Sequence, residues 1–220
     1  MSHADWTTVD GPHQDQPLER DGTPVADATA AAVLVHGRGA TARSILQMGE
    51  EFGREGLATL APQAARNTWY PNPFTAPVET NEPGRTSGLR AVHDAVSTAE
   101  EAGIPRDRVL IAGFSQGACL ASEFVARAPD RYGGLAALSG GLIGDRVDPE
   151  AYAGDLEGTP VFFGCSDVDP HIPAERVHVS ADVFERLGGD VTKRLYEGMG
   201  HGVNRDEIAF VSEMVAELLD

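Results

Sequence analysis

The feature that most constrains the fold is a regular alternation of two kinds of segment. Short apolar runs with the length and composition of buried strands recur along the chain, bounded by glycine, proline or polar turn residues. They lie at 31–36, 57–62, 108–114, 134–140, 159–165 and 191–198. Segments with helical periodicity lie at 42–56, 85–103, 117–128, 172–189 and 206–220. Strands that alternate with helices favour a parallel sheet covered on both faces, because parallel neighbours need crossover connections.

The fold class that follows is α/β, in one domain. A chain of 220 residues is within the usual range for a single α/β domain. We expect this domain to cover residues 31–220. Residues 1–30, rich in Asp, Gly, Pro and Thr, are expected to be an irregular lead-in with at most an edge strand near "QPLERDG".

The charge balance is strongly acidic. Asp and Glu number 34 against 17 Lys and Arg, which gives a formal net charge of −17, and Lys193 is the only lysine. Such a surface repels nucleic acid and anionic membranes, so neither is an expected partner. It also destabilises the compact state unless salt screens it, which predicts a salt-adapted protein. The polar N-terminus lacks the pattern of a secretory signal, and a cytoplasmic location is predicted.

A candidate nucleophile lies in "GFSQGA", residues 113–118. The motif Gly-x-Ser-x-Gly follows a predicted strand and precedes a predicted helix, which is the setting of a nucleophile elbow. Gly113 and Gly117 fit this interpretation because a side chain at either position would collide with a neighbouring strand or helix in so tight a turn. Ser115 is therefore predicted to be a nucleophile; the alternative is a plain strand-to-helix turn.

A serine hydroxyl needs a base, and the base needs a group that orients it. His201, in "EGMGHGVN", is the histidine that follows the last predicted strand in a turn of small residues, whereas others lie in or before helices or in the lead-in. Its alternative role is to cap the final helix. The acid is expected in the loop after 159–165, which offers Asp167 and Asp169. We favour Asp169, at the turn into the next helix, because Asp167 could instead fix the loop through hydrogen bonds to nearby backbone.

An acyl-transfer site also needs donors for the developing oxyanion, each worth about 3 kcal/mol in the transition state. One predicted donor is the backbone N–H of Gln116, at the start of a helix whose dipole adds a favourable field. The other is the N–H of Arg38 in "HGRGAT", residues 36–41, which follows the first parallel strand. His36 is expected to brace this loop, and an ordinary glycine turn is the alternative.

The segments "VLVHGRGAT", "GFSQGA", "DVDPHIP" and "GMGHGV" resemble the four signature segments of the phospholipase/carboxylesterase family, the acyl-protein thioesterase-like branch of the α/β-hydrolases. The resemblance runs from about residue 31 to the C-terminus. It implies an α/β-hydrolase fold with a mostly parallel central sheet and helices on both faces. It assigns the same roles as above to the residues Ser115, Asp169, His201, Arg38 and Gln116.

The expected function is that of a serine carboxylesterase, which hydrolyses a small-molecule ester through an acyl-enzyme intermediate and needs no metal or organic cofactor. Thioesterase or lysophospholipase activity on longer acyl chains is the enzymatic alternative, and a hydrolase-fold binding protein is the non-enzymatic one. Members of this family are often dimers, so a homodimer stays open.

The proline-rich stretch 63–84 fits no regular element and is expected to be a functional loop. It resembles the corresponding loop of bacterial and archaeal carboxylesterase-like members more than that of eukaryotic thioesterases. Trp69, Tyr70 and Phe74 are candidates for the wall of a substrate pocket. The alternative is that these aromatic side chains pack the loop onto the domain. Whether the loop forms a lid stays open. The two cysteines, Cys119 and Cys165, are interpreted as small buried hydrophobic residues.

Overall fold

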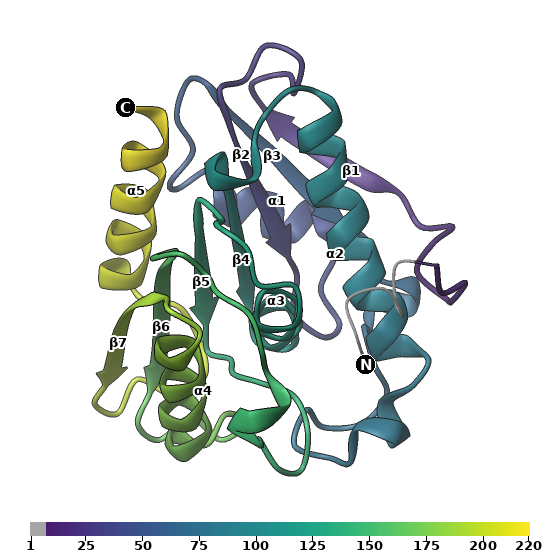
Figure 1. Ribbon diagram of the computed structural model, residues 1–220, viewed down its shortest axis with the longest axis vertical. Coiled ribbons are helices and arrows are strands. Elements are labelled where there is room, and N and C mark those ends of the chain that lie inside the picture. The colour runs from purple at the N-terminus through teal and green to yellow at the C-terminus, as the bar shows by residue number, and fades with distance from the viewer. Residues whose placement is uncertain (1–7) are drawn as a thin grey trace.

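The computed structural model describes residues 8–220 and is built around a seven-stranded sheet (Figure 1). The strand order is β1-β3-β2-β4-β5-β6-β7. The strands are β1 (Leu18–Gly22), β2 (Ala30–Val35), β3 (Leu57–Pro62), β4 (Val109–Phe114), β5 (Gly134–Leu138), β6 (Pro160–Ser166) and β7 (Asp190–Tyr196). All neighbours are parallel except β1 and β3, which pair antiparallel at one edge. The α/β fold class predicted from the sequence is confirmed.

Five α-helices cover the two faces of the sheet. They are α1 (Ala42–Gly49), α2 (Gly84–Glu101), α3 (Gln116–Arg127), α4 (Ala174–Arg186) and α5 (Arg205–Leu219). Helices α2, α3 and α4 pack on one face, and α1 and α5 pack on the other (Figure 1). Residues of β2 alternate between the two apolar cores, with Val33 facing the first and Leu34 the second. This alternation explains why the central strands read as unbroken apolar runs: both of their faces are buried.

The observed elements match the expected ones with small differences at their ends. The first helix ends at Gly49 rather than running to residue 56, although Phe52 beyond its end is still buried. Within the predicted lead-in, Leu18–Gly22 forms the antiparallel edge strand, and Leu18 pairs with Pro62. The first seven residues of that lead-in lie outside the described residues. None of the helices in residues 8–220 is long and apolar enough to cross a bilayer.

The parallel strands bring the turns that contain the predicted site residues to one edge of the sheet. The turns after β2, β4, β6 and β7 all leave from the carboxyl ends of parallel strands, and ligand sites of open α/β sheets lie at that edge. The loop between β3 and α2 joins them there; it contains two short 3₁₀ turns, Ala65–Asn67 and Val78–Asn81. Two further 3₁₀ turns, Arg106–Arg108 and Pro149–Ala151, lie elsewhere.

Candidate active site

Ser115 lies in a strained turn between β4 and α3. Its backbone has φ 57° and ψ −121°, in a region that residues with a side chain rarely adopt, and α3 begins at the next residue. A Cβ built on Gly117 would lie 2.0 Å from the carbonyl oxygen of Val35, and one built on Gly113 would lie 2.6 Å from the backbone of Gly117. Only glycine fits at either position, as the sequence analysis expected, and the tight turn exposes the serine hydroxyl at the edge of the sheet.

Three of the predicted side chains form a continuous hydrogen-bonded chain. Nε2 of His201 lies 2.9 Å from Oγ of Ser115, and Nδ1 of the same ring lies 2.7 Å from Oδ2 of Asp169. The imidazole comes from the turn between β7 and α5, and the carboxylate comes from the turn between β6 and α4. With Nδ1–H donating to the carboxylate, Nε2 is left to accept the proton of the serine hydroxyl.

The carboxylate of Asp169 is held in its charged form. Burial of this side chain would raise its pKa, but hydrogen bonds from His201 and from the backbone N–H groups of His171 and Ile172 outweigh burial, so the pKa lies below its usual value. The two backbone bonds reach Oδ1 at 2.8 and 3.0 Å. The acid is therefore ionised at neutral pH and already points at the imidazole.

Asp167, the other candidate acid, lies elsewhere. Its Oδ1 accepts a hydrogen bond from the backbone N–H of Gly198 at 2.8 Å, which ties the loop after β6 to the loop after β7. This is the loop-fixing role that the sequence analysis gave as its alternative. The geometry therefore separates the two aspartates, and Asp169 is the one placed at the imidazole.

The two predicted oxyanion donors flank Ser115. Gln116 is the first residue of α3, where N–H groups have no partner within the helix. Arg38 follows β2, and the preceding Gly37 approaches Ser115 so closely that a Cβ added to it would lie 3.5 Å from the serine Cβ. Within residues 8–220, neither N–H has a protein acceptor. Both are therefore free to bind a developing negative charge beside the serine.

A cavity of about 480 Å³ opens beside these groups. Two of the three predicted aromatic residues, Tyr70 and Phe74, line it together with Ser115, Cys119 and His201. None of the described residues that line the cavity is acidic. Because aromatic, proline and aliphatic side chains make up much of the lining, the cavity is suited to a largely apolar group next to the serine hydroxyl.

Trp69 does not line this cavity. Its ring is fully buried between His13 and His36, and its indole N–H donates to the carbonyl oxygen of His36 at 2.8 Å. It borders a second cavity, which His13 also lines. Trp69 therefore packs the loop onto the domain, which was the alternative role considered for these aromatic residues.

The sequence analysis assigned no site role to two rings that contact the imidazole or to one thiol in the cavity lining. The ring of Phe114 lies 5.0 Å from that of His201, and the ring of His171 packs edge-on at 4.8 Å. Both line the cavity, as does Cys119, a buried free thiol one helical turn after Ser115. Their signal in the sequence was proximity: Phe114 precedes the serine, His171 follows Asp169 by two residues, and Cys119 has the i+4 spacing of one helix face.

A mostly parallel sheet with a strained serine turn at its carboxyl edge defines this protein as an α/β-hydrolase. The family model described as Phospholipase/Carboxylesterase matches residues 23–219, so the chain belongs to that family. The resemblance inferred from the four signature segments is thereby confirmed.

Relatives of known sequence and structure agree with this assignment. The chain is similar to Acyl-protein thioesterase 1 of Kluyveromyces lactis, 29% identical over 139 residues, which cover 62% of this chain and 61% of that protein. It is also similar to Acyl-protein thioesterase 1 of Gibberella zeae, 30% identical over 58% of this chain and 55% of that one. The match thus spans about three fifths of the length of these curated relatives. The crystal structure of a phospholipase/carboxylesterase from Dyadobacter fermentans superposes with a TM-score of 0.87 and 39% identity, over 91% of this chain and 96% of that one.

Proposed function

We propose that the protein is a serine esterase that hydrolyses carboxylic esters through an acyl-enzyme intermediate. The observation that carries this proposal is the chain of two hydrogen bonds, 2.9 Å from Ser115 to His201 and 2.7 Å from His201 to Asp169, beside a cavity. Family membership supports an ester or thioester as the substrate class. The roles of the individual residues are our inference from their positions.

The proposed reaction begins with attack of Ser115 Oγ on the ester carbonyl carbon. As the new C–O bond forms, Nε2 of His201 takes the hydroxyl proton, and Asp169 stabilises the resulting imidazolium through its bond to Nδ1. The carbonyl oxygen becomes an oxyanion between the N–H groups of Arg38 and Gln116, and the helix dipole of α3 adds to that field.

The intermediate then collapses, and the bond between the carbonyl carbon and the leaving oxygen breaks. His201 returns its proton to that oxygen, so the alcohol departs neutral and the acyl group stays on Ser115. A water molecule then loses a proton to His201 and attacks the acyl carbonyl carbon. The bond from that carbon to Ser115 Oγ breaks, His201 returns the proton to Oγ, and the carboxylic acid leaves. Serine, imidazole and carboxylate are thereby restored to their starting forms.

The cavity favours an ester with a modest apolar portion, because Tyr70, Phe74 and Phe114 supply apolar wall. The net charge of −17 disfavours polyanionic substrates. A thioesterase function is the second candidate, because the relatives named Acyl-protein thioesterase 1 are 29% and 30% identical over the matched regions.

The proposal is tested with chromogenic esters from acetate to palmitate, matched thioesters, and a fluorophosphonate probe, all at molar salt. We expect Ser115→Ala to abolish labelling and to lower kcat at least about 10³-fold. Ser97→Ala, on α2 and away from the cavity lining, should leave both unchanged. Ester hydrolysis by Ser115→Ala at the wild-type rate would contradict the mechanism.

The two aspartates provide a sharper test of the acid. Asp169→Asn should lower kcat by about 10³- to 10⁴-fold, because the amide can no longer hold the imidazole in the required tautomer. Asp167→Asn, a matched change two residues away, should reduce kcat only slightly, since its partner is the Gly198 backbone. The opposite order of effects would assign the acid to Asp167.

A further inference from the structure

The guanidinium of Arg38 lies against the loop after β3. Its Nη2 donates to the carbonyl oxygens of Tyr70 and Asn72, each at 2.8 Å, and its Nη1 donates to that of Pro71 at 3.0 Å. Three consecutive carbonyls thus converge on one guanidinium. Bonds from a charged donor are about twice as strong as neutral ones, so this contact fixes the curvature of the loop.

The side chain of Gln116 reaches the same loop from the other side of Ser115. Its Oε1 accepts a hydrogen bond from the N–H of Trp69 at 2.9 Å, and its Nε2 donates to the carbonyl oxygen of Tyr70 at 2.9 Å. The Tyr70 carbonyl therefore receives both side chains, one on each of its lone pairs. It is the point at which the two contacts meet.

The loop needs these donors because its backbone carbonyl groups cannot all form hydrogen bonds within the loop itself. Pro71 and Pro73 have no N–H, so the segment cannot join a sheet ladder or continue a helix. Its carbonyls require donors from elsewhere, since backbone groups left unpaired are costly. The same segment supplies Tyr70, Pro71, Pro73 and Phe74 to the cavity wall.

We propose that Arg38 and Gln116 are positioning residues that join the substrate-binding wall to the oxyanion donors as one unit. Each places its backbone N–H beside Ser115 and uses its side chain to hold residues 69–72. The proposal rests on the proposed esterase function. Its consequence is that the wall formed by Tyr70 and Phe74 keeps a fixed position relative to the oxyanion donors. An ester whose apolar part lies against this wall then has its carbonyl placed between those donors.

The proposal assigns the cation of Arg38 to the loop rather than to substrate. The two terminal nitrogens of the guanidinium make three hydrogen bonds to carbonyl oxygens. None of the ion pairs in the described part of the chain includes Arg38. Loss of the guanidinium should therefore affect esters according to the length of their apolar chain. A binding site for substrate charge would instead make the effect depend on whether the ester carries an anion.

The experiment compares Arg38→Met, Arg38→Lys, Gln116→Met and the double variant Arg38→Met/Gln116→Met. Arg43→Met is the control, because that arginine is largely exposed on α1 and its ion-pair partner within residues 8–220 is Glu19, 3.5 Å away. We measure kcat and KM with nitrophenyl acetate, nitrophenyl octanoate and an octanoate analogue with a terminal carboxylate. All three esters need the same backbone N–H groups, so a general loss of alignment would lower kcat for each of them, and the contribution of the loop is read from the octanoate loss relative to the acetate loss.

With octanoate, kcat/KM should fall about tenfold in Arg38→Met and in Gln116→Met, mainly through KM, and less in Arg38→Lys. The double variant should lose less than the product of the two single losses, because both side chains hold the Tyr70 carbonyl. Equal losses for acetate and octanoate, or a loss confined to the anionic ester, would overturn the proposal.

A second measurement does not depend on catalysis. The chain has two tryptophans, so a Trp6→Phe background leaves Trp69, fully buried on the held segment, as the sole tryptophan, whose indole can be excited selectively over the tyrosines. Quenching of Trp69 by acrylamide should rise in Arg38→Met and Gln116→Met and stay unchanged in Arg43→Met. Unchanged quenching in the first two variants would reject the positioning role. Absence of activity in the wild type would instead reject the esterase function.

Discussion

Replacement of Glu207 by glutamine is expected to change how the stability of the protein depends on pH. Glu207 is fully buried at the start of α5, where its Oε2 accepts the N–H of Asn204 at 2.7 Å and completes a capping box. Its Oε1 has no hydrogen-bond partner in the described part of the chain and lies against Gly164 of β6. Burial raises the pKa of this carboxyl to about 7, helped by the negative charge of Asp206, while the Asn204 N–H opposes the shift.

The direction of the effect follows from the raised pKa. The folded state binds the proton more tightly than the unfolded chain, whose glutamates have a pKa of 4.5. The stabilising contribution of the protonated group is therefore complete below that value and is lost as the pH rises through 7. Between about pH 5 and about pH 8, the loss in the free energy of unfolding amounts to about 2.5 kcal/mol.

Glutamine isolates this contribution because it remains neutral and can still accept the Asn204 N–H, as capping boxes allow. We would measure the free energy of unfolding by urea denaturation at several pH values and constant salt. The advantage of Glu207→Gln over the wild type should grow by about 2.5 kcal/mol from about pH 5 to about pH 8. Glu213→Gln, an exposed position on the same helix, should show no such growth. Parallel pH profiles for Glu207→Gln and the wild type would refute the reasoning.

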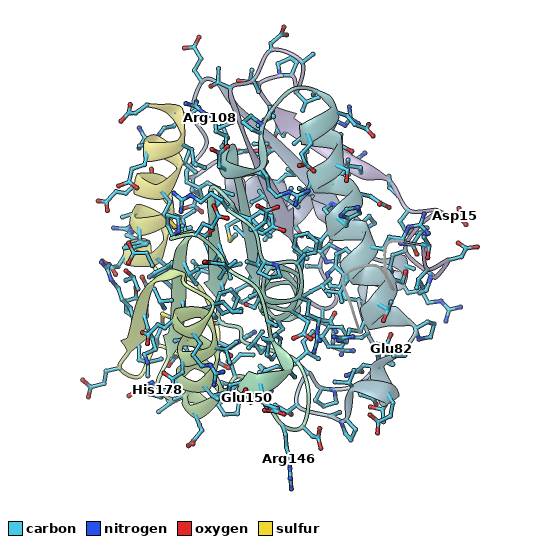
Figure 2. All side chains as sticks on the ribbon, viewed as in Figure 1. Asp15, Glu82, Arg108, Arg146, Glu150 and His178 are labelled. Atoms are coloured by element: carbon cyan, nitrogen blue, oxygen red, sulfur yellow. The ribbon has the colours of Figure 1, made fainter. Side chains whose placement is uncertain are left out.

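Two further predictions concern the elbow and the surface. Gly117→Ala should destabilise the fold by at least about 3 kcal/mol in urea denaturation, since its Cβ would lie 2.0 Å from the Val35 carbonyl oxygen. Gly202→Ala, whose Cβ meets nothing within 4 Å, should unfold within about 0.5 kcal/mol of the wild type; equal losses in both would contradict the steric argument. Charged side chains such as Asp15 and Arg146 project from the periphery (Figure 2). Because the net charge is −17, the melting temperature should rise between about 0.1 M and about 1 M KCl, as the Debye length falls from about 10 Å to about 3 Å. A melting temperature that is flat or falls would remove the case for salt adaptation.

The sheet and the elbow could be predicted because their sequence patterns follow from steric and packing requirements. A strand with both faces buried must be apolar throughout, as in Ala30–Val35, and the serine turn admits only glycine at 113 and 117. The sequence favoured Asp169 over Asp167 as the acid but could not decide between them. Their roles depend on the path of a short loop, and both residues have a short carboxylate suited to either role.

Two other features, the contacts of Arg38 and the burial of Glu123, could not be predicted. Their interaction partners are backbone carbonyls in one case and a side chain of a distant element in the other. Every residue has a carbonyl, so nothing in the sequence marks those of residues 70–72 as acceptors for Arg38. Glu123 on α3 would be expected at the surface, yet it is fully buried and paired with Arg85, 2.6 Å away on α2, and with Arg127 on its own helix. Burial would raise the pKa of Glu123, but Arg85 and Arg127 outweigh burial and hold that pKa below its usual value. The hydroxyl of Tyr152 also donates to Oε2 at 3.2 Å.

The loop after β3 is bound to the body of the domain by two neutral histidines. Nε2 of His36 accepts the N–H of Ala64 at 3.1 Å, and Nδ1 of His13 accepts that of Ala65 at 3.0 Å. The other ring nitrogen of each lies within hydrogen-bond distance of a backbone carbonyl, which fixes the tautomer. Burial lowers the pKa of both histidines, so they keep this accepting nitrogen to a pH below the usual titration range of the imidazole. Together with Arg38 and Gln116, these rings bind residues 64–72 from both sides, which argues that this part of the loop is a fixed wall of the cavity rather than a lid.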